Sequence, residues 1–91
     1  MSTKHEEAPY GMELILDLRG CDVSLFNRSD IERFFSGLCK LIDMEQCDLH
    51  FWDDVGVPRR ERQTNPKTKG TSAVQFILTS TIVIHTLDLM K

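Results

Sequence analysis

The most constraining feature of this 91-residue chain is a pair of apolar runs near its carboxyl end. Residues 70–88 read GTSAVQFILTSTIVIHTLD, and Thr79 and Ser80 separate the two runs. Each run has the length of a strand, and a short polar step between two such runs is typical of a β-hairpin. The sequence therefore predicts two antiparallel strands joined by a tight bend at Thr79 and Ser80.

A serine at a tight bend can react with the peptide bond that precedes it. The Ser80 hydroxyl can attack the carbonyl of Thr79 and replace the peptide by an ester, which requires a stabilised oxyanion and a group that carries protons. Elimination then ends one chain at Thr79 and leaves a dehydroalanine, which hydrolyses to a pyruvoyl ketone at position 80. Such a ketone can condense with a substrate amine and withdraw electrons from it, the role of bound cofactors in other decarboxylases.

A histidine follows this serine by five residues, at His85. In a strand over residues 81–86, His85 shares a face with Thr81 and Val83, while Ile82 and Ile84 point to the other face. A histidine in this place could take up and return protons near neutral pH.

This segment resembles the self-cleaving region of the short bacterial and archaeal S-adenosylmethionine decarboxylases, in which an internal serine becomes a pyruvoyl group. The matching residues, in register without a gap, are Gly70, Ser72, Ser80, Ile84, His85 and Thr86. The resemblance implies that Ser80 is the pyruvoyl precursor at a Thr79–Ser80 cleavage site. It also implies that His85 and Ser72 are the processing partners. Ser72 would then lie near the same end of the site and donate a hydrogen bond to the oxyanion.

The same resemblance implies an activity and a cofactor. The cofactor would be the pyruvoyl group made from Ser80, with no metal. The reaction would be decarboxylation of S-adenosylmethionine or a related amine, a step in the synthesis of polyamines such as spermidine. The alternative is a homologue that is not processed, has no activity and works as a binding or regulatory subunit.

Departures from the family's usual pattern keep both functions open. Family members usually have glutamate before the serine and histidine after it, where this chain has Thr79 and Thr81. Their His-Thr pair usually continues with Trp-Pro-Glu, where residues 87–89 read LDL. Their catalytic cysteine lies on a further strand, and this chain ends at Lys91. We therefore expect a divergent member that lacks the C-terminal part and its cysteine, with the substrate amine left open.

Upstream of the hairpin, the pattern predicts a strand, a helix and another strand. Residues 12–18 alternate in hydropathy like a half-buried strand. Ser29 and Glu32 form a capping box at the start of a helix that we expect to end near Met44. The apolar stripe of that helix is Ile31, Phe34, Phe35, Leu38, Cys39 and Ile42. The next strand covers residues 48–52, with Leu49 and Phe51 on one face and His50 and Trp52 on the other.

This order, β-α-β-β-β, predicts an α+β two-layer sandwich in which one helix covers one face of an antiparallel sheet. We expect a flexible arm over residues 1–10 and a single domain over 11–91 with a long loop at 53–70. The loop has a local excess of two positive charges. It is either a solvated flexible loop or a lid or partner contact that attracts an anion such as a carboxylate. Apolar residues on both sheet faces exceed what one helix covers, so we expect a homodimer through the sheet.

Composition excludes several other classes. The net charge of −3 argues against general nucleic-acid binding, which needs a concentrated basic face. The apolar stretches are too short to span a membrane, so no membrane contact is expected. The three cysteines form no C-x-x-C pair, which indicates reduced thiols in a cytoplasmic protein. A zinc site from Cys39, Cys47 and His50 has poor spacing, and ordinary core thiols are the alternative reading.

Overall fold

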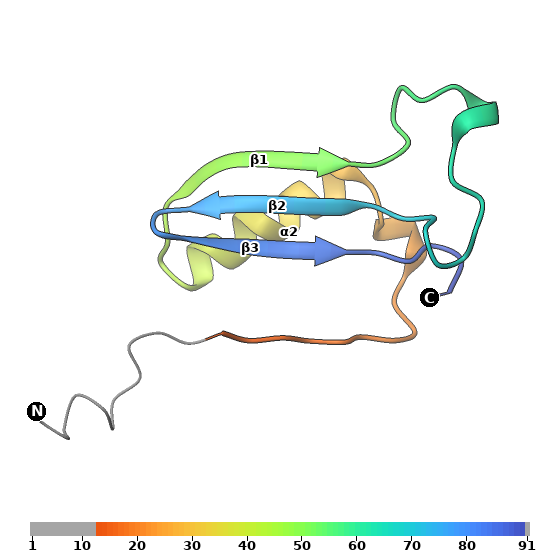
Figure 1. Ribbon diagram of the computed structural model, residues 1–91. Helices are drawn as coiled ribbons and strands as arrows, with labels where there is room; N and C mark the ends of the chain where they lie inside the picture. Colours follow the sequence, from red (N-terminus) through yellow and green to blue (C-terminus); the bar gives the residue numbers. More distant parts are fainter. Residues whose placement is uncertain (1–12, 91) are drawn as a thin grey trace, which may run out of the picture.

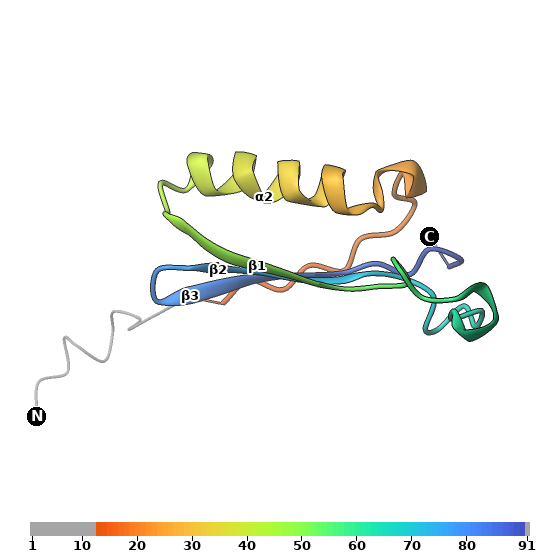
Figure 2. The ribbon, with the colours of Figure 1, turned by 90° about the horizontal axis from the view of Figure 1, so that it is seen from above.

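The structure, a computed structural model, describes residues 13–90, so the expected arm over residues 1–10 lies outside the described residues. Its elements are η1 (Val23–Leu25), α2 (Arg28–Leu41), β1 (Gln46–Trp52), η2 (Arg59–Glu61), β2 (Ser72–Ile77) and β3 (Ser80–His85). The strands form an antiparallel sheet in the order β1-β2-β3. The helix α2 lies across one face of this sheet (Figure 1, Figure 2). The predicted α+β class is confirmed.

The predicted strand over residues 12–18 is wrong for the part that the structure describes. Residues 13–18 form no strand, and Met12 lies outside the described residues. The side chains of Leu14 and Ile15 are 78% and 80% exposed. An alternating pattern gives a segment the capacity to be a strand, but the segment becomes one only when a neighbour accepts its backbone hydrogen bonds. Among the described residues the order is therefore α-β-β-β.

The helix α2 begins earlier and ends earlier than the sequence indicated. Its N-cap is Asn27, whose side-chain oxygen accepts a hydrogen bond of 2.9 Å from the backbone N–H of Asp30. The capping box predicted at Ser29 is wrong, because Ser29 already lies inside the first turn. The last helical residue is Leu41 rather than Met44, and Asp43 has a left-handed φ of 57° just beyond it. No helix in the described part of the chain is long and apolar enough to cross a membrane.

The hydrophobic core lies between α2 and one face of the sheet. Ile31 and Phe35 of the helix pack with Ala73 of β2, and all three are buried. The partly buried side chains that pack against them are Leu49, Phe51, Ile82 and Ile84. The predicted faces of these strands are therefore confirmed. The helical stripe is narrower than predicted, since Phe34 and Ile42 at its margins are exposed.

The opposite face of the sheet is not covered by α2 (Figure 2). We call it the open face. Cross-strand pairing arranges its residues in rows, one made by Trp52, Ser72 and His85 and the next by His50, Val74 and Val83. Two of the residues that the sequence nominates for chemistry, Ser72 and His85, thus lie on the side of the sheet away from the helix. Ser80 shares the parity of Ile82 and Ile84, which pack toward the helix.

Candidate functional site

The Thr79–Ser80 peptide lies at the tip of the β2–β3 hairpin. Ile77 pairs with Ser80, so Leu78 and Thr79 alone make the turn. Thr79 has a left-handed φ of 66°, a conformation that is an outlier for a β-branched residue. Its hydroxyl donates a hydrogen bond of 2.6 Å to the carbonyl of Leu78. The bend therefore lies one residue earlier than predicted, because Ser80 already pairs as the first residue of β3. Ser80 directly follows this tight and strained bend.

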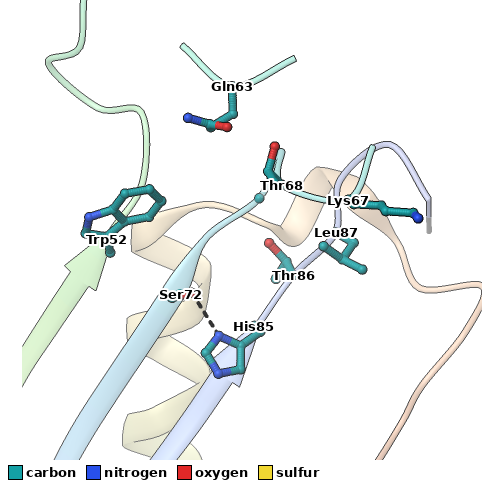
Figure 3. Close-up of a pocket in the computed structure, with 9 residues that line it drawn as sticks. Trp52, Gln63, Lys67, Thr68, Ser72, His85, Thr86 and Leu87 are labelled. Carbon is teal, nitrogen blue, oxygen red and sulfur yellow. Dashed lines mark hydrogen bonds between the residues drawn. The ribbon is translucent and has the colours of Figure 1, made fainter. Parts of the chain in front are cut away.

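Ser72 and His85 form a hydrogen-bonded pair at the other end of the hairpin. They lie directly opposite each other on β2 and β3, and 2.8 Å separates Ser72 Oγ from His85 Nδ1 (Figure 3). Ser72 is half-buried and His85 is exposed on the open face. Either atom can be the donor, depending on the histidine tautomer.

The structure does not bring Ser80 to this pair within one protomer. The antiparallel register that pairs Ile77 with Ser80 also pairs Ser72 with His85. Five residues of strand, at roughly 3.4 Å each, place Ser80 about 17 Å from His85. Ser72 therefore lies at the same end of the hairpin as His85, and both are far from Ser80 within one chain, because a two-residue turn fixes this register.

A cavity of about 340 Å³ adjoins the Ser72–His85 pair. Trp52 and Gln63 line it together with the pair, and the Trp52 side chain is 66% exposed (Figure 3). Lys67 also lines the cavity, but its side chain extends away from Ser72 and His85 (Figure 3). The long loop 53–70 thus supplies part of the wall of this cavity.

Two of the family-matching residues, Gly70 and Thr86, hold the ends of β2 and β3 together. The Thr71 N–H donates to Thr86 Oγ1 at 2.9 Å, and the Thr86 N–H donates to the Thr71 carbonyl at 2.8 Å. Thr86 Oγ1 in turn donates to Asp88 at 2.9 Å. A β-carbon at Gly70 would overlap the Thr86 carbonyl. These residues fix the ends of β2 and β3 beside the Ser72–His85 pair.

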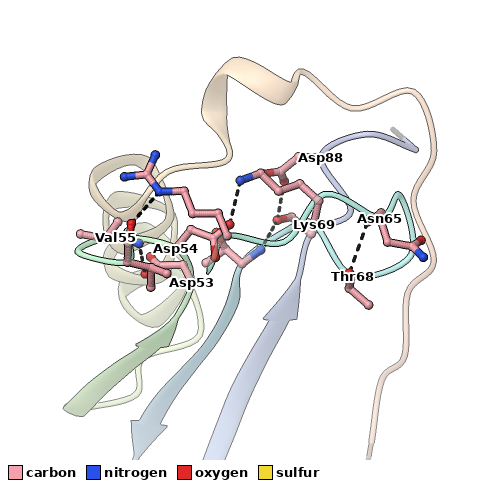
Figure 4. Close-up of polar contacts among 11 residues, drawn as sticks. Asp53, Asp54, Val55, Asn65, Thr68, Lys69 and Asp88 are labelled. Atoms are coloured by element: carbon pink, nitrogen blue, oxygen red, sulfur yellow. Dashed lines mark hydrogen bonds and ion pairs between the residues drawn. The ribbon is translucent and has the colours of Figure 1, made fainter. Parts of the chain in front are cut away.

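The adjacent carboxylates Asp53 and Asp54 follow β1 and serve separate ion pairs (Figure 4). Asp53 accepts two hydrogen bonds from Arg28, at 2.7 and 2.8 Å, and these hold the pKa of the Asp53 carboxyl below its ordinary value. The same contact raises the pKa of Arg28. Asp54 accepts from Lys69 at 2.7 Å. This pair of carboxylates thus anchors the chain after β1.

Among residues 13–90, no group of three or more metal-ligating side chains could hold a metal ion. The three cysteines are free, with Cys39 buried, Cys21 half-buried and Cys47 exposed. Cys47 lies inside β1 rather than before it, because the strand begins at Gln46. It lines a second cavity, at the hairpin end of the open face, which sequence reasoning missed.

Comparison with known proteins agrees with the family resemblance seen in the sequence. The sequence model of the S-adenosylmethionine decarboxylase family matches residues 12–89, which is most of the chain. The protein therefore belongs to the S-adenosylmethionine decarboxylase family, whose members in general depend on a pyruvoyl group. No curated protein and no solved structure matches the chain.

Proposed function

We propose that this protein is a pyruvoyl-dependent decarboxylase that cleaves itself between Thr79 and Ser80 and acts on S-adenosylmethionine or a related amine. The left-handed Thr79 immediately before Ser80 carries the proposal. Strain of this kind is costly for a threonine and is commonly concentrated at functional sites. Attack by the Ser80 hydroxyl converts the strained peptide into an ester, which frees the bend. The pyruvoyl group at position 80 supplies an electron sink for decarboxylation.

The tautomer of His85 determines which residue of the Ser72–His85 pair donates the hydrogen bond between them. When Nδ1 of His85 carries its proton, it donates to Ser72 Oγ at the observed 2.8 Å. The hydroxyl proton of Ser72 is then free to bind an oxyanion at Thr79, and Nε2 of His85 is free to exchange protons.

The separation of Ser80 from this pair favours a shared site in a homodimer. The open face presents exposed Trp52, Phe76 and Val83, and a large uncovered apolar surface marks an interaction site. When two open faces stack, a two-fold axis can lie between them and perpendicular to the strands. Rotation about this axis places the hairpin tip of one sheet against the opposite end of the other sheet. The Thr79–Ser80 bend of one protomer then faces Ser72 and His85 of its partner. In this arrangement a single protomer is incomplete.

The second candidate function is an unprocessed homologue that serves as a binding or regulatory subunit. The observation in its favour is the same separation, since an isolated chain has no proton-carrying partner from this pair at its bend. Thr79 and Thr81 also stand where the family usually has glutamate and histidine.

Intact mass measured under denaturing conditions tests the proposed function. We expect the wild-type chain to yield one fragment ending at Thr79 and one beginning with a pyruvoyl group at position 80. Ser80→Ala is expected to remain whole while keeping its fold, because it removes only a hydroxyl. A wild-type chain that stays intact after long incubation contradicts self-processing and supports the regulatory subunit.

A further inference from the structure

The helix α2 has two unlike flanks. Phe35 points into the core, and Ser36 donates a hydrogen bond to the Gln46 side chain of β1 at 3.3 Å, so the flank that carries Ser36 faces the β1 edge of the sheet. Helical spacing of about 100° per residue places Phe34 and Leu41 on the opposite flank, toward β3. Their side chains are 55% and 82% exposed. The helix therefore leaves an exposed apolar flank above the β3 edge of the sheet.

The strand β3 forms one edge of the sheet, because the strand order is β1-β2-β3. The Thr86 N–H donates to the Thr71 carbonyl, which makes these two residues a hydrogen-bonded pair. Such pairs alternate along antiparallel strands, so the backbone N–H and C=O groups of Thr81, Val83 and His85 point away from β2. A row of free backbone groups at an edge is a template for one more strand.

The segment 13–18 lies along this edge, in the plane of the sheet, and runs in the same direction as β3 (Figure 1, Figure 2). It carries Leu14, Leu16 and Leu18 at alternate positions, and all three side chains are exposed. Within the described part of the chain, its backbone makes no hydrogen bond with β3. The segment thus has the apolar alternation of a half-buried strand but has neither a neighbouring strand nor a cover.

We propose that this protein forms a segment-exchanged dimer, in which segment 13–18 of each chain adds to the β3 edge of the other. Pairing with β3 of the same chain would be parallel within an otherwise antiparallel sheet. A two-fold axis perpendicular to the sheet reverses the partner's segment, so that it runs antiparallel to β3. The two exchanged segments pair with each other at the axis. One continuous antiparallel sheet results, to which each chain gives three strands and its segment.

This exchange covers the exposed flank of α2. When Leu14, Leu16 and Leu18 turn to the helix side of the sheet, they lie next to Phe34 and Leu41, and water leaves both sets of side chains. The exchange uses the edge of the sheet and leaves the open face free. It is therefore compatible with stacking of open faces, and the two perpendicular two-fold axes together give a tetramer. The inference does not rest on cleavage at the hairpin bend.

The first test replaces Leu16 by proline and by valine. Proline has no N–H and is excluded from a paired central strand, whereas an unpaired exposed segment accepts it. We expect Leu16→Pro to halve the mass in solution measured by light scattering and to keep the helical circular dichroism signal, because α2 does not depend on the segment. Leu16→Val, which keeps the N–H and an apolar side chain, is expected to match the wild type. An unchanged mass for Leu16→Pro would overturn the inference.

Hydrogen exchange distinguishes exchange between chains from pairing within one chain. We expect the amides of residues 13–18 to be protected in concentrated wild-type protein and to exchange at least about tenfold faster after dilution below the dissociation constant. In Leu16→Pro they should exchange fast at every concentration. Protection in the wild type that does not change on dilution would show that the segment pairs with its own β3. That result would overturn the inference, and so would fast exchange in concentrated wild-type protein.

Discussion

Residue by residue, the family-matching positions divide into those that could do chemistry and those that hold the backbone in place. Ser72 and His85 meet across the strands through their side chains. Gly70 is needed because its backbone passes against the carbonyl of Thr86. A match in sequence therefore identifies both kinds of residue, and only the contacts separate them.

Gly70→Ala is expected to destabilise the protein by about 1–3 kcal/mol, because the added β-carbon overlaps a backbone atom that can move only with β3. Gly37→Ala is the matched control. Gly37 lies inside α2 with open space around it, so alanine there is expected to stabilise by about 0.5–1 kcal/mol. Urea unfolding curves of the two variants measure both effects. Equal effects of the same sign would contradict the close approach at Gly70.

Several residues could not be assigned from the sequence because their roles depend on register. The identity of Gln75 gives no sign that it is buried. Its burial is explained by a β-bulge between Gln46 and Leu49 of β1, where the Gln75 amide donates to the carbonyl of Cys47. Cys47 looked like a residue before the strand for the same reason. Period-two alternation predicts faces correctly only where no bulge intervenes.

At the scale of elements, the hairpin and the helix were predictable because each carries its own local signal. Strand-length apolar runs and a two-residue step predict β2 and β3, and the helical stripe predicts α2. The extended segment at residues 13–18 was not predictable, because whether it pairs depends on a neighbour that its own sequence does not specify. The helix start was misplaced by two residues, since Asn27 and Ser29 are both good N-cap residues.

The corrected cap leads to a direct comparison. Asn27→Ala is expected to destabilise the protein by about 1 kcal/mol, because the N–H of Asp30 loses its acceptor. Ser29→Ala is expected to change stability by less than about 0.5 kcal/mol, since Ser29 lies in the first turn on the surface. Thermal unfolding followed by circular dichroism distinguishes the two. A larger loss for Ser29→Ala would contradict the observed helix start.

For the whole molecule, the most informative feature is the open face, the side of the sheet that α2 does not cover. The helix covers one face of the sheet, while the other carries exposed apolar side chains together with the candidate site (Figure 2). Stacking two copies through this face would bury the apolar surface. It would also bring the bend of one chain to the Ser72–His85 pair of the other. The fold class could be predicted from the sequence. The position of Ser80 and of the Ser72–His85 pair at opposite ends of the hairpin could not, because it depends on the strand register.

Mixing two inactive variants tests the central claim, that cleavage at Thr79–Ser80 uses Ser72 and His85 of the partner. His85→Ala keeps Ser80 and loses the histidine, and Ser80→Ala keeps the histidine and loses the nucleophile. Each variant alone is expected to stay intact. After the two are unfolded and refolded together, intact mass should show cleavage of the His85→Ala chain only. If the wild type cleaves but the refolded mixture does not, or if His85→Ala cleaves alone, the shared site is contradicted.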